Sequence, residues 1–414
     1  MAHVTKRIGL SLGADICWPI AFTEIMKRLD LTIAVKRDKV RFQVERMTID
    51  PFDVREPKRY DLVIDRLTHW YPMRREWIKK AVVMDDVYVF NNPWAVQSME
   101  KLTTYAAMIR LGFPIPETWL IPPHSYEPMA DLEYTLKAYA RLFDLGAIGR
   151  KLGYPMFMKP YDGGGWRAVT KLDDESALRE AYDQSGKLVM TLQAAVHPSD
   201  RFVRCIGLGP QTHVILYDPK AALHDRYTIA RDFMTAEERS LVDGMTMVIN
   251  AFFGWDFNSC ELLHKQGTWH PIDFANPCPD SQVTSLHYHF PWLIKANIRW
   301  ATFAAATGRK VKQLDWQPFF DAVEEGMTLR ERLDALVPLA KRRFDADRFE
   351  EFCARNLAHL DAVTHDWFGT DDAREAARRK VAALFPPHEV EAFTDLFFQR
   401  IQQWRADEPA GAGS

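Results

Sequence analysis

The sequence predicts an α/β fold followed by a helical segment at its carboxyl end. Three features of the 414-residue chain indicate this. Residues 6 to 96 alternate short apolar runs, typical of strands, with stretches of helical spacing. A second strand-rich region carries a glycine triplet between two strands, and from about residue 288 helical spacing dominates.

The first region reads as a small open sheet with helices. An apolar–polar alternation through Val40, Phe42 and Val44 indicates an extended segment, and Tyr60 to Ile64 is a candidate for a buried strand. The elements expected here are strands at 7–12, 39–50, 60–64 and 82–90 and helices at 19–29 and 74–81.

The second region begins after Asn92-Pro93, which interrupts the chain. Pro114 and Pro116 fix their backbone φ angles and bias the residues before them away from helix, so an extended exit follows. The elements expected here are helices at 95–111 and 131–152 and strands at 119–121, 156–159 and 169–172.

The last region predicts helices at 319–325, 329–344, 348–360 and 371–384. The small, polar residues 406–414 predict a frayed tail. We therefore expect domains at 1–95, 96–290 and 291–405, followed by this tail.

Composition narrows the classes of protein. Hydrophobic residues make up 47% of the chain, and 53 basic residues face 56 acidic ones, so disorder, a nucleic-acid surface and an anionic membrane are disfavoured. Five cysteines without C-x-x-C spacing suit reduced thiols, and the first residues lack the apolar core of a signal peptide. We expect a cytoplasmic protein that acts on small molecules, and its oligomeric state stays open, a homo-oligomer included.

A glycine-rich loop is the strongest local signal. A strand delivers Lys159, and Gly163, Gly164 and Gly165 follow before the next extended run. Backbone N–H groups of such a loop can cradle phosphates, and the lysine adds a positive charge. The pattern is not a Walker A loop, and three glycines between strands, taken alone, are more often a hairpin turn.

An acidic group is the second signal. A hairpin would bring Glu261 and Asp273 side by side, with Asn276 close behind. Two carboxylates and an amide oxygen are hard ligands that suit Mg²⁺. Singly, each of these residues is also ordinary turn or surface chemistry.

Together these motifs, in this order, resemble the ATP-grasp superfamily over about residues 92 to 280. Glu100-Lys101-Leu-Thr-Thr and Leu111-Gly-Phe-Pro-Ile-Pro-Glu-Thr118 are similar to that family's helix with the first ATP lysine and the strand after it. Lys159 and Gly163 to Gly165 match the second ATP lysine and the flexible loop over the phosphates.

The resemblance also implies roles for later residues. Gln193 and Ala194 would form the adenine hinge, and Arg204 would lie near the transferred phosphate. Glu261, Asp273 and Asn276 resemble the ligand set for Mg²⁺ or Mn²⁺, although the usual ending is Glu-x-Asn and here Asp273 precedes Asn276 by three residues.

The resemblance implies an ATP-grasp α+β fold with an N-terminal Rossmann-like pre-ATP-grasp domain and an α-helical C-terminal extension. Arg66 and Arg226 are candidates for holding a substrate carboxylate, because a guanidinium grips one bidentately. An ordinary surface ion pair is the alternative for either arginine.

The implied activity is an ATP-dependent carboxylate–amine ligase that forms an amide through an acyl phosphate, releasing ADP and phosphate. Its partners would be ATP and a small carboxylate and amine, without nucleic acid or membrane. A small-molecule kinase on the same fold and a non-catalytic ATP-binding sensor or partner protein remain alternatives.

Overall fold

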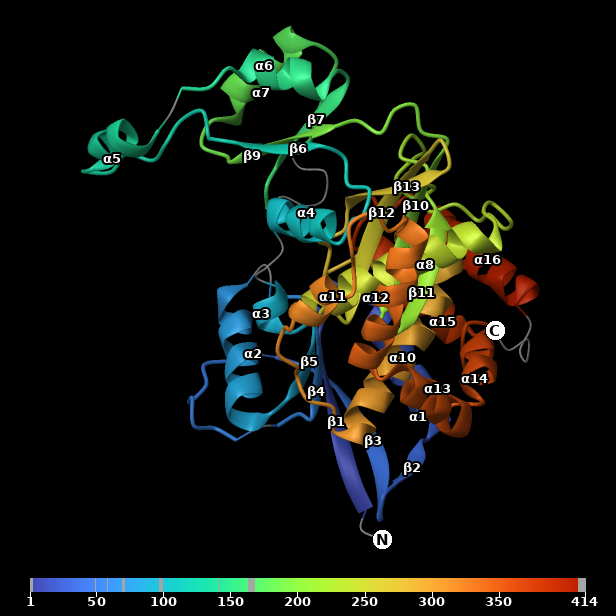
Figure 1. Cartoon of the computed structure of the whole chain (residues 1–414). Helices are drawn as coiled ribbons and strands as arrows, with labels where there is room; N and C mark the ends of the chain where they lie inside the picture. Colours follow the sequence, from blue (N-terminus) through green and yellow to red (C-terminus); the bar gives the residue numbers. More distant parts are fainter. Residues whose placement is uncertain are drawn as a thin grey trace. The chain divides into compact units, whose positions relative to one another are not determined.

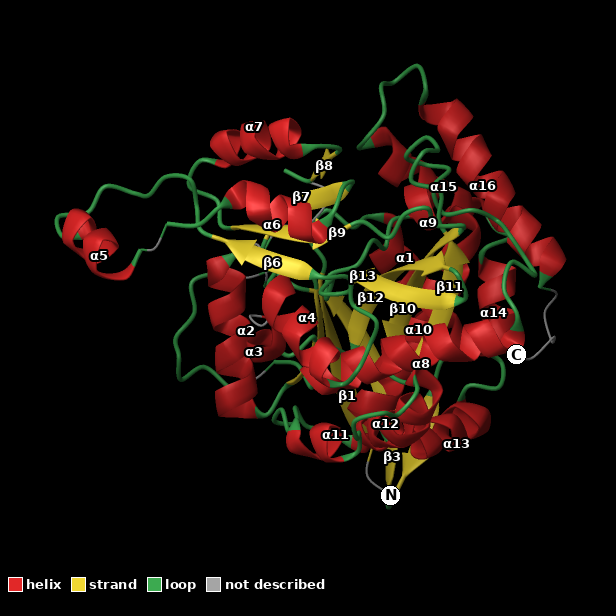
Figure 2. Ribbon diagram, turned by 45° about the horizontal axis from the view of Figure 1, so that its top comes forward, coloured by secondary structure: helices red, strands yellow, loops and turns green. Residues whose placement is uncertain are grey.

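The computed structural model describes residues 3–48, 50–57, 59–68, 71–96, 100–140, 142–162 and 168–408. Its internal contacts divide the chain into two units. Unit 1 comprises the described residues of 1–98, 203–259 and 277–414, and unit 2 those of 99–202 and 260–276. The labelled elements are drawn in Figure 1, and strands and helices occur in both units (Figure 2). The chain is thus a mixed α/β protein, while the domain boundaries expected from the sequence stay a prediction.

The amino-terminal part of unit 1 forms a five-stranded sheet in the order β2-β3-β1-β4-β5. Strands β3, β1, β4 and β5 run parallel, and β2 pairs antiparallel with β3. The strands are β1 (His3–Ser11), β2 (Thr32–Val35), β3 (Asp38–Arg46), β4 (Leu62–Asp65) and β5 (Tyr88–Phe90). All four residues of β4 are buried, as expected for a parallel strand inside a sheet.

Helices cover this sheet through apolar contacts. In α2 (Pro72–Asp85), Ile78 and Ala81 share a core with Val63 of β4 and Val89 of β5. Helix α10 (Phe290–Thr307) contacts β1 and β4, and nearly all of its residues are buried, which is the pattern of a core helix. Two further helices of this part are α1 (Cys17–Leu29) and α3 (Pro93–Val96).

A second sheet has the order β11-β10-β12-β13. Its strands are β10 (Arg201–Leu208), β11 (Gln211–Leu216), β12 (Phe257–Lys265) and β13 (Thr268–Asp273). Helix α8 (Ala236–Phe253) contacts β11 and begins with a capping box, in which the side chains of Thr235 and Glu238 satisfy each other's backbone N–H groups.

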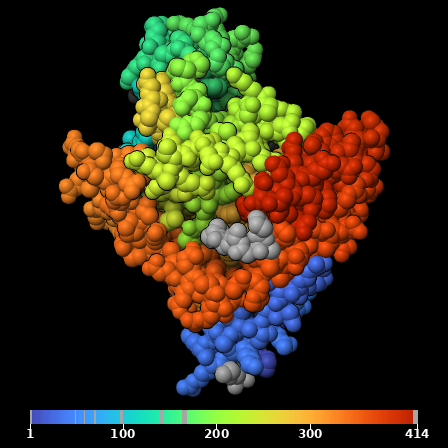
Figure 3. Space-filling view, turned by 90° about the vertical axis from the view of Figure 1, so that its right-hand side faces the viewer, coloured from blue at the N-terminus to red at the C-terminus, as the bar shows by residue number. Residues whose placement is uncertain are grey.

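The carboxyl-terminal part of unit 1 is helical among its described residues. Its elements are α9 (Val283–Leu286), the 3₁₀ turn η1 (His287–His289), α11 (Gln317–Asp321), α12 (Leu329–Phe344), α13 (Ala346–Asn356), α14 (Leu360–Trp367), α15 (Asp371–Ala382) and α16 (Val390–Asp407). Helices α14 and α15 contact α1, so the two ends of the described chain share one core. In Figure 3 the orange and red atoms of these helices lie against blue atoms of the amino-terminal segment.

Unit 2 is built on a four-stranded antiparallel sheet in the order β6-β9-β7-β8. Leu145 of α6 and Leu178 of α7 pack with Met156, Met158 and Leu192 of the sheet. The elements of the unit, besides β13 and most of β12, are α4 (Lys101–Arg110), β6 (Thr118–Ile121), α5 (Leu132–Tyr139), α6 (Leu145–Leu152), β7 (Met156–Pro160), β8 (Thr170–Leu172), α7 (Glu175–Ser185) and β9 (Met190–Ala194).

Several expected elements differ from the structure. The helices expected at 319–325 and 348–360 end at Asp321 and Asn356, and residues 406 and 407 of the expected frayed tail belong to helix α16. Two further elements are wrong in type or number. Residues 82–85 continue helix α2 instead of beginning a strand, because Ile78 and Ala81 set a helical contact with the sheet that overrides the β-propensity of two valines. The helix expected at 131–152 is two helices, α5 and α6, since the Asp144 side chain caps a new helix by accepting from the Ala147 N–H at 2.9 Å.

Every helix in the described part of the chain is too short or too polar to cross a membrane. The Rossmann-like character of the first region and the separate carboxyl-terminal extension stay predictions.

Candidate functional site

The hairpin of β12 and β13 positions the acidic residues of unit 2. Its two turn residues, Gln266 and Gly267, both have positive φ angles, 48° and 80°, as a tight two-residue turn requires. This turn sets Lys265 opposite Thr268. Further along the ladder, Glu261 lies opposite Asp273.

A bulge in this hairpin adds an acceptor to the site. Leu262 pairs with Pro271 and Glu261 with Asp273, so Ile272 is an extra residue in β13. The Ile272 carbonyl oxygen accepts hydrogen bonds from Lys159 Nζ at 3.1 Å and from the Tyr105 hydroxyl at 2.7 Å. The bulge thus gives two side chains a common acceptor.

Lys101 is the first residue of helix α4 and is buried. Its Nζ lies 2.5 Å from Asp273 Oδ2, and its backbone N–H donates to the carbonyl oxygen of Tyr161. Asn276 Nδ2 lies 3.5 Å from the other Asp273 oxygen. Asp273 therefore joins the first predicted ATP lysine to the predicted metal ligands.

Lys159 projects from β7, and its side chain is also buried. Its Nζ donates to Gln193 Oε1 at 2.8 Å as well as to Ile272. Burial lowers the pKa of Lys159 to about 8; attraction to Asp273 opposes this effect, and repulsion from Lys101 adds to it. The ammonium group is thus held by neutral oxygens and is sensitive to charge brought nearby.

Tyr105 and the side chain of Gln193 are site groups that the sequence analysis missed. The Tyr105 ring lies 5.5 Å from Lys159 Nζ, and burial, followed by the charge of Asp273, raises the pKa of its hydroxyl well above the ordinary value. Gln193 Nε2 donates to the Thr118 hydroxyl at 2.9 Å, which fixes the amide that receives Lys159. The i, i+4 spacing of Lys101 and Tyr105 on one helix was a signal that could have identified the tyrosine.

The main chain of the predicted adenine hinge lies in the sheet. Gln193 pairs with Thr118 on one side and Phe157 on the other. The Ala194 N–H donates to the Glu117 carbonyl at 2.9 Å. In this structure Gln193 reaches the site through its side chain. The predicted glycine loop, Gly163, Gly164 and Gly165, lies outside the described residues.

The three predicted arginines belong to unit 1. Arg204 of β10 lies over the rings of Tyr217 and Tyr227 at 4.4 and 5.5 Å and donates to the Tyr227 hydroxyl at 2.6 Å. Arg66 forms an ion pair with Asp15, N to O 2.8 Å.

Arg226 Nε donates to the Ala221 carbonyl at 3.3 Å, a contact that holds its own loop. Unit 2 therefore brings together the predicted lysines, carboxylates and asparagine, and unit 1 carries the predicted arginines.

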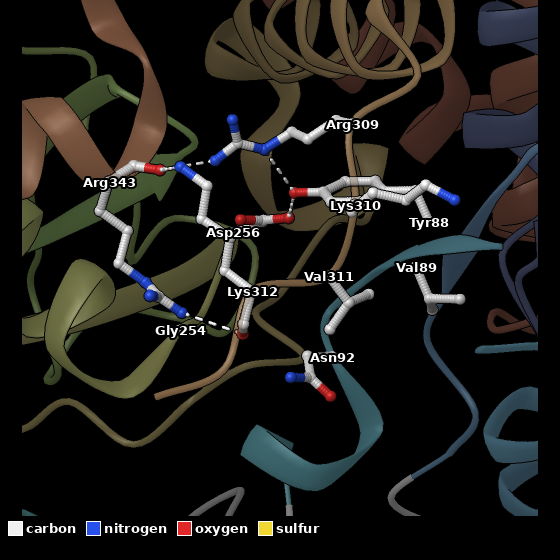
Figure 4. A pocket seen from close by; sticks show the side chains of 10 residues that line it. All are labelled: Tyr88, Val89, Asn92, Gly254, Asp256, Arg309, Lys310, Val311, Lys312 and Arg343. Atoms are coloured by element: carbon white, nitrogen blue, oxygen red, sulfur yellow. Dashed lines mark hydrogen bonds between the residues drawn. The ribbon is translucent and has the colours of Figure 1, made fainter. Parts of the chain in front are cut away.

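A small pocket in unit 1 has a basic lining (Figure 4). Its residues are Tyr88, Val89, Asn92, Gly254, Asp256, Arg309, Lys310, Val311, Lys312 and Arg343. Arg309 donates through Nε to the Tyr88 hydroxyl at 3.0 Å, through Nη1 to Asp345 at 2.5 Å and through Nη2 to the Arg343 carbonyl at 2.7 Å. Tyr88 in turn donates to the buried Asp256. All three nitrogens of Arg309 have acceptors, so this group stabilises unit 1.

The ligands expected for a divalent cation can be tested against the contacts of unit 2. Glu261 is buried, Asp273 is about a quarter exposed, and both offer carboxylate oxygens, which with the Asn276 amide oxygen is a donor set that fits Mg²⁺. Among the described residues no three His, Cys, Asp or Glu side chains form a ready-made metal site. Two carboxylates and two lysines leave the site near electrical neutrality, so an anion and its metal can enter together.

No family model matches the sequence, and no curated protein matches it. Solved structures do match. The RimK domain ATP-grasp protein from Sphaerobacter thermophilus is 14% identical, with 66% of this chain and 92% of that chain covered and a TM-score of 0.44. D-alanine–D-alanine ligase from Bacillus anthracis, in complex with ATP, is 13% identical, with 83% and 99% covered and a TM-score of 0.46.

The macrocyclase MdnC from Microcystis aeruginosa, bound to its precursor peptide MdnA, is 11% identical, with 72% of this chain and 100% of that chain covered and a TM-score of 0.48. These proteins are what the chain is similar to. The function proposed below depends on the side chains of the site.

Proposed function

We propose that the chain is an ATP-dependent carboxylate–amine ligase that forms an amide through an acyl phosphate and releases ADP and phosphate. The observation that carries the proposal is the cluster of Lys101, Lys159, Glu261 and Asp273 in unit 2, joined by the 2.5 Å contact of Lys101 with Asp273. Two buried ammonium groups beside two carboxylates are the charges that an ATP phosphate chain and its metal require.

The two lysines would neutralise negative charge on the phosphate chain of ATP. Lys101 and Lys159 offer positive charge where the phosphate oxygens of ATP would lie, and their burial strengthens each contact. Lys159 Nζ donates hydrogen bonds to Gln193 and to the Ile272 carbonyl, and these two contacts orient its ammonium group. Tyr105 shares the Ile272 carbonyl and so keeps this acceptor in place.

Glu261, Asp273 and Asn276 would hold Mg²⁺ or Mn²⁺. When bound, the metal supplies charge neutralisation for the phosphate oxygens. Asp273 pairs with Lys101 in this structure, and if Asp273 also held the cation, the ammonium group of Lys101 would be left for the nucleotide. Lys101 would thus pair with Asp273 in the free protein and with the nucleotide in the complex.

Further parts of the proposal are the glycine loop as a cover that excludes water and Arg204 as a group that neutralises the transferred phosphate. A carboxylate oxygen attacks the γ-phosphorus of ATP, and the bond from this phosphorus to the bridging oxygen of ADP breaks. The amine nitrogen then attacks the acyl carbon and loses a proton, and phosphate departs.

The test is release of ADP and phosphate from Mg-ATP across pools of amino acids, small carboxylic acids and polyols, with mass spectrometry of each active pool. We expect equal amounts of ADP and phosphate, and a product whose mass equals the summed masses of its carboxylate and amine substrates minus one water. A phosphorylated product without free phosphate would show a kinase instead, and binding of Mg-ATP without release of ADP from any pool would favour a sensor.

Variants of the two lysines link the activity to this site. Lys101→Met and Lys159→Met each remove a charge-assisted contact, so we expect kcat/KM for ATP to fall about 10- to 100-fold. Lys171→Met is the matched control, because Lys171 is half exposed and pairs with Asp173. Wild-type kcat/KM in both site variants would remove this cluster from the proposal.

A further inference from the structure

An arm of unit 2 exposes large apolar side chains to solvent. It comprises residues 124–143, with α5 in its middle, and residue 141 lies outside the described part of it. In Figures 1 and 2, α5 stands apart from α6, α7 and the sheet of unit 2. None of the described side chains of α5 is buried. A helix of 8 residues is marginal in water by itself, so α5 needs a surface to pack on.

Both ends of the arm are attached to helix α7. At its start, the ring of His124 lies edge-on to Tyr182 with 5.4 Å between the ring centroids, and the Ser125 N–H donates to the Gly186 carbonyl at 2.9 Å. At its end, the ring of Phe143 lies 6.1 Å from the same tyrosine. The arm therefore leaves and rejoins unit 2 at one place, and its base is well defined.

The apolar area of the arm is large enough for a stable interface. Tyr134 is 77% exposed, and Leu142 is fully exposed. Together with Tyr126, Met129 and Phe143, which are 39% to 65% exposed, they offer about 600 Å² of surface. A stable complex buries about 800 Å² on each partner, and roughly six-tenths of this area is apolar. The arm alone therefore supplies the apolar part of one interface.

Helix α5 has an exposed face that complements itself. Glu133 and Lys137 lie one turn apart on this face, and Tyr134 and Ala138 lie beside them with the same spacing. All four side chains are exposed. In an antiparallel second copy of the helix, related by a two-fold axis, Glu133 faces the lysine of the other helix and Tyr134 faces the small alanine. Each of these contacts then occurs twice.

We infer that the arm joins two copies of this chain, with the exposed faces of their α5 helices packed antiparallel across a two-fold axis. The area of the arm matches one side of such an interface, and the charge pattern of α5 favours an identical partner over an unrelated one. The inference is independent of the proposed function, because this contact requires neither ATP nor a substrate.

The first measurement is the mass of the full-length protein by sedimentation equilibrium over a range of concentrations. We expect the wild type to approach twice its monomer mass of 47.9 kDa as concentration rises. Tyr134→Ser removes a large exposed side chain from α5 and is expected to raise the dissociation constant of the dimer at least tenfold. Leu223→Ser is the matched control, because Leu223 is 73% exposed in unit 1, and it should associate like wild type.

Two charge variants distinguish a contact between copies from one within a helix. Glu133→Lys sets lysine against lysine across the axis, and Lys137→Glu sets glutamate against glutamate, so each should dimerise at least tenfold more weakly than wild type. An equal mixture of the two variants should dimerise better than either alone, because every lysine then faces a glutamate of the other copy. Within each helix the charges stay alike, so mixing cannot restore a contact inside one helix.

Three outcomes would overturn the inference. They are a wild type that stays monomeric at every concentration, a dimer that Tyr134→Ser leaves as stable as before, and a mixture of the charge variants that associates no better than either one. The three substituted side chains are exposed, so each variant is expected to fold like wild type, and circular dichroism with thermal unfolding checks this.

Discussion

Two buried arginines of unit 1 show opposite states of hydrogen bonding. Arg309 has acceptors on all three nitrogens, from Tyr88, Asp345 and the backbone of Arg343. Arg66 has an acceptor on Nε, and its buried Nη1 has none among the described residues. The two side chains are similarly buried, at 6% and 9% exposed.

The difference is between a guanidinium group whose nitrogens all have acceptors within the fold and one with a buried nitrogen that has none among the described residues. A guanidinium whose donors are all used lowers the energy of the folded chain and has nothing left for a ligand. One that keeps a buried donor unused stays in place only because the surrounding structure holds it. Burial and charge alone would have ranked the two arginines as equals.

The largest expected effect is a loss of stability when Arg309, whose nitrogens all have acceptors, is replaced. Arg309→Met leaves buried Asp256 and Tyr88 without their cation, so we expect the free energy of unfolding in urea to fall by about 3–5 kcal/mol. Lys310→Met is the control: its exposed pair with Asp86 predicts a change within about 0.5 kcal/mol. Similar stability losses in the two variants would show that the bonding of Arg309 is not decisive.

Lys159 extends the comparison to unit 2, where a buried cation has only neutral partners within hydrogen-bond distance. Its pKa of about 8 means that the free protein loses this charge above pH 8, while bound phosphate favours the charged form. ATP affinity is therefore expected to be constant below pH 8 and to fall by up to tenfold per pH unit above it, as titrations from pH 7 to 9.5 would show.

Calorimetry at pH 8.5 in two buffers of different ionisation enthalpy should detect proton uptake on ATP binding. Lys159→Arg stays charged throughout, so its affinity should lose the pH dependence even where it is weaker overall. A flat profile in the wild type would contradict the assignment of Lys159.

A smaller effect tests whether the Arg309 group acts independently of its helix. Helix α12 carries Arg343 in its last turn and begins with a capping box of Thr328 and Glu331. Thr328→Ala is expected to cost about 1 kcal/mol in urea unfolding, and Thr328→Ser much less. The cap and Arg309 contact different ends of α12, so the losses in free energy of unfolding should add in the double variant of Thr328→Ala with Arg309→Met. A strongly non-additive loss would show that the cap and the Arg309 contacts are coupled.

The smallest expected change in the free energy of unfolding concerns Arg66, which has a buried nitrogen without an acceptor among the described residues. Arg66→Met alone leaves the buried Asp15 carboxylate without its cationic partner. The double variant Arg66→Met with Asp15→Asn removes both charges and the nitrogen that has no acceptor. This double variant should unfold within about 1 kcal/mol of wild type. A loss as large as that of Arg309→Met would show that Arg66 is structural, and the contrast between the two arginines would fail.

The sequence indicated part of the site because its information is local. The hairpin placing Glu261 opposite Asp273 follows from turn residues and strand patterns near one another in the chain. The bulge at Ile272 was not predictable, because its carbonyl is ordered by Lys159 and Tyr105, which are more than 100 residues away. The error at residues 82–85 has the same origin, since packing of α2 on the sheet overrode local propensity.

Much of the fold was accessible from periodicity, including β1, α1, β3, α12 and α15. The grouping of residues 203–259 with the amino-terminal sheet was not, because no local pattern encodes which distant segments share a core.

The hydrogen bond from Lys380 to Ala14 spans 366 residues, and it has a consequence for biosynthesis. At typical rates of translation the ribosome adds the second partner roughly 20 to 70 seconds after the first. For the greater part of this interval, until residues 290–307 have been added, β1 and β4 exist without α10, the core helix that contacts them. A nascent chain of this protein therefore needs protection until its final third emerges, and a messenger truncated before codon 290 is expected to yield insoluble product.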